Sequence, residues 1–84
     1  HKIRVNALCP GDVEGERIRR VITMEAESRG MAYDEVVAER VAAVSLRTMV
    51  TADDIADMML FLCSDAGARV SGQAVLIDGN AERA

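Results

Sequence analysis

Aromatic side chains are nearly absent from this chain of 84 residues, which has one tyrosine, one phenylalanine and no tryptophan. Single-stranded nucleic acids are bound by stacking their bases on aromatic rings, and this chain has no set of rings for that purpose. An excess of basic residues is also missing, because 14 acidic residues outnumber 10 lysines and arginines and the net charge is −4. A nucleic-acid-binding domain is expected to present a basic face. We therefore expect no nucleic acid partner.

Cysteine and long apolar runs are also scarce. The two cysteines, Cys9 and Cys63, lie inside apolar stretches and do not have the spacing of a metal site or a redox motif. We interpret both as buried, reduced thiols, which is typical of a cytoplasmic protein. No apolar run approaches the ~20 residues needed to cross a bilayer and no signal-peptide pattern is visible, so we expect no membrane partner.

Half of the residues are nevertheless apolar, and they cluster in dense runs at 55–63 and 74–77. A chain of this length buries roughly 60% of its unfolded surface, which is too little to cover so much apolar surface. The first residue is His1 rather than Met, and a predicted strand starts two residues later. We therefore expect residues 1–84 to be a fragment of a larger domain, and we expect no catalytic role for His1.

Residues 1–15 are predicted to form a strand followed by a sharp turn. Apolar and polar side chains alternate over Ile3–Cys9, as is typical of a strand. Pro10 then removes a backbone donor, and Gly11 permits a tight change of direction. Open α/β sheets bind ligands at the carboxyl ends of strands, so this turn is the candidate ligand site, although Pro-Gly after a strand is more often an ordinary turn.

Residues 16–44 are predicted to form two helices. Apolar residues at helical spacing place the first at about Glu16–Ser28, before an Arg-Gly stop, and Glu16 precedes Arg20 by four residues, a spacing that favours an ion pair. The second covers about Asp34–Val44 and has four valines on one side. Because valine lowers helix propensity, tertiary contacts must support this helix.

Residues 51–79 are predicted to form a third helix and a last strand. Thr51 suits an N-cap, and Asp54 three residues later completes a capping box. The helix continues to about Ser64 and is apolar nearly all round, so we expect other parts of the protein to cover it on more than one side. The strand Gln73–Ile77 shows no alternation, which suits a parallel sheet clad on both faces. Strand, helices and strand in this order predict an α/β fold.

Four pieces of the sequence, taken in order, carry a family resemblance. They are Ile-Arg-Val-Asn-Ala-Leu-Cys-Pro-Gly-Asp-Val from Ile3, Ser45-Leu46-Arg47 with Thr51–Ala56, Phe61–Ser64, and Ser71–Gly79. In that order, the four pieces resemble four parts of short-chain dehydrogenases/reductases. These parts are the sixth strand with its turn, the connector with the penultimate helix, the end of that helix, and the last strand. The resemblance covers essentially the whole chain, as the C-terminal third of a family member.

The resemblance implies the C-terminal part of a doubly wound, Rossmann-like parallel sheet. It also implies an oxidoreductase that uses NAD or NADP to interconvert an alcohol and a carbonyl compound. Pro10, Gly11 and Val13 match family positions that pack on the nicotinamide or bind its carboxamide through the backbone. Gly15 occupies a cofactor-binding position that is commonly a carboxamide-bonding threonine, and the glycine departs from that pattern.

The remaining segments match other parts of a family member. Residues 16–44 match the substrate-binding lid, and the helix and strand within 51–79 match elements that usually lie in a homotetramer interface. The resemblance thus implies a homo-oligomer, a tetramer or a dimer, which would account for the surplus apolar surface.

The family's Gly-x-x-x-Gly-x-Gly phosphate turn and its catalytic Ser and Tyr-x-x-x-Lys do not occur in these residues. Tyr33 cannot replace the tyrosine, because Val37 and not lysine stands four residues later. We therefore predict no catalytic residue in this chain. A non-catalytic structural or oligomerisation segment stays open as the alternative function.

Three further groups of residues have two interpretations each. An arginine cluster could meet an anionic substrate, although a solvated helix face explains it too. Three aspartates could suggest a metal, but two of them fit a helix start, so we expect no metal site. The methionines suit a core or an apolar substrate pocket. The arginine cluster is Arg17, Arg19 and Arg20. The aspartates are Asp53, Asp54 and Asp57, and the methionines are Met24, Met31, Met49, Met58 and Met59.

Overall fold

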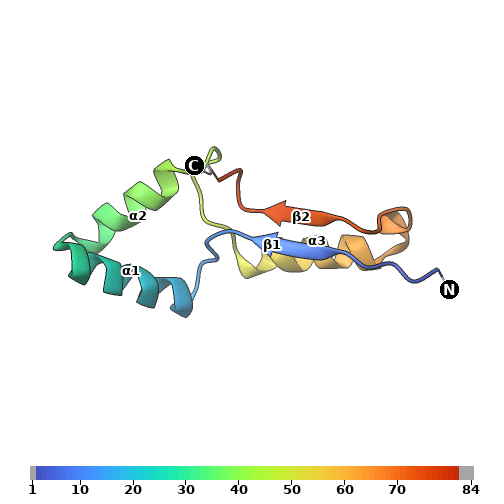
Figure 1. Cartoon of the computed structure of the whole chain (residues 1–84), viewed down its shortest axis with the longest axis horizontal. Helices are drawn as coiled ribbons and strands as arrows, with labels where there is room; N and C mark the ends of the chain where they lie inside the picture. Colours follow the sequence, from blue (N-terminus) through green and yellow to red (C-terminus); the bar gives the residue numbers. More distant parts are fainter. Residues whose placement is uncertain (1, 82–84) are drawn as a thin grey trace.

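Two short parallel strands bring the two ends of the chain together (Figure 1). The computed structural model describes residues 2–81, so the prediction for His1 lies outside the described residues. β1 (Ala7–Pro10) pairs with β2 (Ala74–Ile77) in parallel, and each residue of β1 lies opposite the corresponding residue of β2. The predicted parallel pairing across a long connection is confirmed.

β1 begins later than the sequence pattern predicts, because a side chain interrupts the ladder. The Asn6 side-chain oxygen accepts the Gln73 N–H at 3.1 Å, in the place where a backbone carbonyl would continue the sheet. Val5 is still held to the loop before β2, since its carbonyl accepts the Gly72 N–H at 2.7 Å. The segment before Ala7 is therefore tied to its neighbour without being part of the strand.

α3 (Ala52–Cys63) forms with the predicted capping box and packs against β1. The Thr51 hydroxyl accepts the Asp54 N–H at 3.1 Å, and the Asp54 carboxylate accepts the Thr51 N–H at 2.8 Å. Ser64 follows the last helical residue, and a short 3₁₀ turn, η1 (Asp65–Gly67), leads toward β2. The predicted boundaries of this helix are confirmed.

The layer made by α3, β1 and β2 leaves much of its apolar surface uncovered. Leu62 is buried, whereas Leu60 is 70% exposed and Leu76 in β2 is 57% exposed. The expected cover on both faces is therefore not supplied within residues 2–81. The interpretation of both cysteines as buried is wrong for this chain, because Cys63 is exposed and Cys9 is half-buried; both thiols are free.

α1 (Glu16–Arg29) and α2 (Tyr33–Ala42) form an antiparallel hairpin. Gly30 ends α1 in the left-handed conformation at φ 64°, which glycine adopts without steric cost. α2 starts one residue before the predicted position and ends two residues before it. It ends early because Val44 leaves the helix to form an antiparallel bridge with Ala81, beyond β2.

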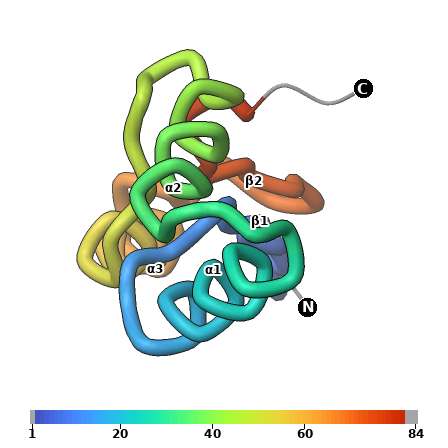
Figure 2. The backbone as a smooth tube through the Cα atoms, turned by 90° about the vertical axis from the view of Figure 1, so that its left-hand side faces the viewer, coloured from blue at the N-terminus to red at the C-terminus, as the bar shows by residue number. Residues whose placement is uncertain are grey.

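The small core lies inside this hairpin, where Ile22 and Val36 are fully buried with Ala26 beside them. The chain as a whole is elongated, measuring 54 × 25 × 18 Å with a radius of gyration of 15.9 Å. A compact domain of 84 residues has a radius of gyration of about 12 Å. Figure 2 views the chain from the hairpin end, with the strand layer behind it. The turn after β1 joins these two parts.

Candidate functional site

The turn after β1 is anchored to the end of β2. The Gly11 N–H donates to the Ile77 carbonyl at 3.0 Å, which extends the strand pairing by one bond. A Cβ atom at Gly11 would lie 2.7 Å from the Cβ of Asp78 and 3.0 Å from its Cα. Glycine is therefore required here by the close approach of the two backbones.

Val13 is fixed by a second parallel contact, an isolated bridge to Val50. The Val50 N–H donates to the Asp12 carbonyl at 3.0 Å, and the Glu14 N–H donates to the Val50 carbonyl at 2.8 Å. In a parallel bridge the residue between these two bonds directs its own N–H and C=O away from the partner strand. Among residues 2–81, neither backbone group of Val13 has a hydrogen-bond partner. Val13 thus presents one donor and one acceptor on the free side of the turn.

Gly15 ends the turn in a conformation that only glycine adopts readily. It is the N-cap of α1, with φ 152° and ψ −174°, and it provides no side chain to cap the helix. No atom would lie within 4 Å of a Cβ at this position, so the space beside it is open. Gly15 therefore turns the chain into α1 and leaves room above the turn.

These features line a pocket of about 590 Å³ between the turn and α1. All four predicted cofactor-binding residues, Pro10, Gly11, Val13 and Gly15, lie in its wall. The other lining residues are Asp12, Glu14, Glu16, Arg17, Ile18, Val21 and Arg40. Of the arginine cluster, Arg17 lines the pocket, whereas Arg19 and Arg20 do not. The structure thus brings the predicted residues together at one cavity.

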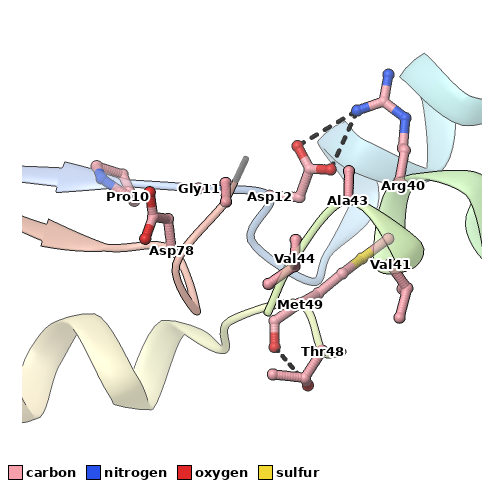
Figure 3. Close-up of a pocket in the computed structure, with 11 residues that line it drawn as sticks. Pro10, Gly11, Asp12, Arg40, Val41, Ala43, Val44, Thr48, Met49 and Asp78 are labelled. Carbon is pink, nitrogen blue, oxygen red and sulfur yellow. Dashed lines mark hydrogen bonds and ion pairs between the residues drawn. The ribbon is translucent and has the colours of Figure 1, made fainter. Parts of the chain in front are cut away.

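Arg40 on α2 reaches across to the turn, as Figure 3 shows. One terminal nitrogen donates to both carboxylate oxygens of Asp12, at 3.1 and 3.3 Å, and the other donates to Glu25 on α1 at 2.9 Å. Glu25 and Glu39 in turn accept from Arg29, each at 2.7 Å. Five charged side chains therefore link α1, α2 and the turn.

The ion pairs shift the titration of their members. Hydrogen bonds from Arg40 and then Arg29 lower the pKa of Glu25, and the hydrogen bond from Arg29 lowers the pKa of Glu39. The hydrogen bond to Glu25, followed by the contacts with Asp12, raises the pKa of Arg40. Glu25, Glu39 and Arg40 are therefore ionised at neutral pH.

A second pocket of about 440 Å³ shares four residues with the first: Pro10, Gly11, Asp12 and Arg40. Figure 3 shows this pocket, whose remaining wall comes from α2, the connector after it and the end of β2. Asp78 is buried there, and its carboxylate accepts the Asn80 N–H at 2.9 Å. Asp12 and Arg40 thus separate two cavities at the junction of the chain's two parts.

The sequence pattern did not reveal Asp12, Arg40 or Glu25 as a connected group. Arg40 and Asp12 lie 28 positions apart, and no short motif signals which charges meet over that distance.

Within residues 2–81, no cluster of three histidine, cysteine or acidic side chains is arranged to hold a metal ion. None of the helices described for these residues has the length and apolar character required to cross a membrane.

Comparisons with known proteins agree with this architecture. A family model described as enoyl-(acyl carrier protein) reductase matches residues 1–80. YxjF of Bacillus subtilis, named an uncharacterised oxidoreductase, is 36% identical over 80 residues, which make up 94% of this chain and 31% of that protein.

Solved structures show the same relationship. A short chain dehydrogenase family protein from Francisella tularensis matches with a TM-score of 0.85 and 32% identity, covering 93% of this chain and 32% of that one. The N-domain of a bacterial malonyl-CoA reductase, solved with NADP, matches with a TM-score of 0.77 and 29% identity, covering 98% of this chain and 17% of that one. The chain therefore spans about a third or less of the relatives it matches. It belongs to the short-chain dehydrogenase/reductase family, and its strands and helices are part of that family's Rossmann-like α/β fold.

Proposed function

We propose that this chain is part of an oxidoreductase that uses NAD or NADP to interconvert an alcohol and a carbonyl compound by hydride transfer. Membership of the short-chain dehydrogenase/reductase family supports this activity. The relative solved with NADP supports a nicotinamide cofactor. In the parent protein, this chain supplies the nicotinamide-side turn, the substrate lid and an oligomer interface.

The backbone of Val13 is the observation that carries the cofactor proposal. A nicotinamide carboxamide has one carbonyl oxygen and one NH₂ group, so it needs one donor and one acceptor from the protein. Val13 offers both on the free side of the turn, next to the pocket of about 590 Å³. Pro10 adds an apolar surface for the ring, and Gly15 leaves open space beside it. The residues present therefore fit the group.

The hydride chemistry belongs to the nicotinamide, and this chain's residues bind and orient it. Val13 would hold the carboxamide through its backbone N–H and C=O, Pro10 would offer an apolar surface to the ring, and Ile18 and Val21 of α1 line the same pocket. The acid–base residues come from the rest of the parent protein. The chain alone is therefore expected to be inactive.

We propose that the hairpin of α1 and α2 is the lid over a small-molecule substrate. Ile18 and Val21 favour an apolar part of that substrate, such as an acyl chain or steroid. Arg17 in the same wall favours an acidic group or a sugar derivative. A panel of substrates should therefore include both classes.

A second function, a non-catalytic structural segment, is favoured by the exposed apolar surface. Met59, Leu60 and Phe61 on α3 and Leu76 on β2 are all exposed in this chain. We propose that another part of the parent protein or a second subunit covers this surface. The two functions are compatible if the parent is an oligomeric enzyme.

Steady-state assays of the parent protein test the proposal. NAD and NADP, in both redox states, are offered with a panel of alcohols and carbonyl compounds while absorbance at the nicotinamide band is followed. Turnover with either cofactor supports the oxidoreductase. If calorimetry detects no binding of any of the four cofactor forms, the enzyme proposal is wrong and the structural segment remains.

A further inference from the structure

We propose that Arg40 is a positioning residue, which acts through Asp12 to hold the peptide of Val13 in its cofactor-binding orientation. This inference rests on the proposed function of the turn. It assigns to α2, within the lid, a direct part in setting the affinity for nicotinamide.

The peptide group between Asp12 and Val13 is the centre of the argument. The carbonyl of Asp12 and the N–H of Val13 belong to one planar unit, so fixing one direction fixes the other. Val50 binds that carbonyl at 3.0 Å, which points the Val13 N–H to the opposite side. The orientation of this donor therefore depends on how Asp12 is held.

Asp12 is held a second time through its side chain. Arg40 contacts both carboxylate oxygens, at 3.1 and 3.3 Å, so the carboxylate is restrained in orientation as well as position. The backbone of Asp12 is thus fixed by Val50 and its side chain by Arg40. Loss of Arg40 removes the side-chain restraint and leaves the two backbone bonds of the bridge to Val50 to hold this part of the turn.

Arg40 itself is fixed by α1. Its second terminal nitrogen donates to Glu25 at 2.9 Å, and Glu25 is about as shielded as Arg40, with 29% and 28% of the respective side chains exposed. Any movement of α2 relative to α1 therefore changes the position of the guanidinium over Asp12. Arg40 therefore connects the hairpin of α1 and α2 to the side chain of Asp12 in the turn.

The placement of this pair argues for positioning more than for stability. Ion pairs with this much exposure contribute little to the free energy of unfolding. The Arg40 Nε, in addition, is buried with no hydrogen-bond partner among the described residues, which costs free energy. Arg40 can affect cofactor binding without contributing much to the free energy of unfolding. It needs only to change how the peptide group of Val13 is oriented.

Linkage makes the effect reciprocal. If closure of the lid on Asp12 favours binding of the cofactor, bound cofactor must favour closure of the lid to the same extent. The weakest coupling commonly found between two such events changes affinity about fivefold. We expect an effect of this size, because the Arg40–Asp12 pair is partly exposed to solvent.

Calorimetric titration of the parent protein with its nicotinamide cofactor tests the inference. Arg40→Gln is expected to raise the cofactor Kd by about fivefold, and to raise KM for the cofactor while kcat changes little. Arg40→Lys keeps the charge but cannot bind both carboxylates with a planar fork, so an intermediate Kd is expected. Arg29→Gln is the matched control, because Arg29 bonds Glu25 and Glu39 without touching Asp12. Its Kd is expected to stay within twofold of the wild type.

A double-mutant cycle with Asp12→Asn separates positioning from a general structural effect. If Arg40 acts through Asp12, the double variant binds no more weakly than Asp12→Asn alone. Additive losses, or an Arg40→Gln Kd equal to that of Arg29→Gln, overturn the inference and leave the proposed function intact. Wild-type protein that binds no nicotinamide cofactor overturns the proposed function and this inference with it.

Discussion

Gly11 and Asp78 approach so closely that a Cβ atom on the glycine would lie 2.7 Å from the Cβ of the aspartate. The contact lies at the carboxyl ends of β1 and β2 and fixes the position of the turn, whose residue Gly11 lines both pockets. The sequence suggested that glycine is needed at this position for a tight change of direction after the strand. The structure supplies a different reason, since the neighbouring strand already occupies the space of a side chain.

Replacement of Gly11 by alanine is therefore expected to destabilise the parent protein. The added methyl must displace backbone atoms of Asp78, which costs about 1–3 kcal/mol of unfolding free energy. Denaturant unfolding measures the loss. Gly72→Ala is a comparison for backbone strain without a clash, because Gly72 has a positive φ and nothing within 4 Å, whereas Gly11 has no positive φ. A Gly11→Ala variant that is as stable as the wild type would contradict the steric explanation.

Gly15→Thr tests whether the position can accept the threonine that the family commonly carries. At φ 152° any side chain strains the backbone, so we expect a loss of about 1–3 kcal/mol in unfolding free energy. Gly15→Ala should lose a similar amount, since the strain arises at Cβ and not at the hydroxyl. A threonine variant that is as stable as the wild type would show that this conformation is not fixed.

Removal of the Thr51 hydroxyl tests the start of α3. Thr51→Ala loses the side-chain acceptor of the capping box and should cost about 1 kcal/mol. Thr23→Ala, in the exposed middle of α1, removes only a bond to the Arg19 carbonyl and should be nearly neutral. Thermal unfolding of the two variants compares them directly. Equal losses of stability in the two variants would contradict the assignment of Thr51 as a stabilising cap.

Acid should loosen the hairpin of α1 and α2. The pKa values of Glu25 and Glu39 are lowered in the folded state, so their stabilisation is complete above the unfolded value, near 4.5, and is lost as the pH falls through the lower folded values. The protection factors of the hairpin amides, which compare the observed exchange with the intrinsic rate at each pH, should fall over that range. Arg29→Gln should move the Glu39 titration back toward its ordinary pKa, as side-chain NMR can follow. An unchanged Glu39 titration would contradict the assignment.

The isolated chain should associate with itself through its uncovered layer. Leu60 is 70% exposed on α3, and the radius of gyration of 15.9 Å exceeds that of a compact domain. Sedimentation should therefore show oligomers, and Leu60→Lys should shift them toward monomer. Glu27→Lys, on the exposed side of α1, is the control for added charge. A monomeric chain that melts cooperatively would contradict this account of the surface.

Local patterns were enough to predict most of the fold. The Arg-Gly stop and the Thr51 capping box are interactions within a few residues, so they mark the ends of α1 and the start of α3 reliably. The start of β1 could not be predicted, because the Asn6 side chain replaces a backbone acceptor for Gln73, a contact between distant residues.

Charge pairs show the same limit. The spacing of Glu16 and Arg20 favours an ion pair, but within residues 2–81 the structure forms none between them. Glu25 and Arg29 have the same spacing and do pair, because Arg40 from α2 also fixes the glutamate. Sequence spacing allows a pair to form, and tertiary contacts decide which one is made.

The sequence predicted where the candidate site lies, but not the contacts that hold it in position. The motif ending in Pro10 and Gly11 located the turn at a strand's carboxyl end, and the structure gathers Val13 and Gly15 at the same pocket. Their contact with a cofactor stays a prediction. The restraint of Asp12 by Arg40 depends on how two helices fold back on the turn, which no local pattern describes.

The central claim is that a nicotinamide ring lies against this turn. Selective ¹⁵N-glycine labelling of the parent protein gives six probes within this chain. On titration with the cofactor, the amide resonances of Gly11 and Gly15 should shift together, while those of Gly67 in η1 and of Gly72, which precedes β2 and bonds Val5, stay in place. Cofactor binding that leaves both Gly11 and Gly15 unmoved would contradict the account.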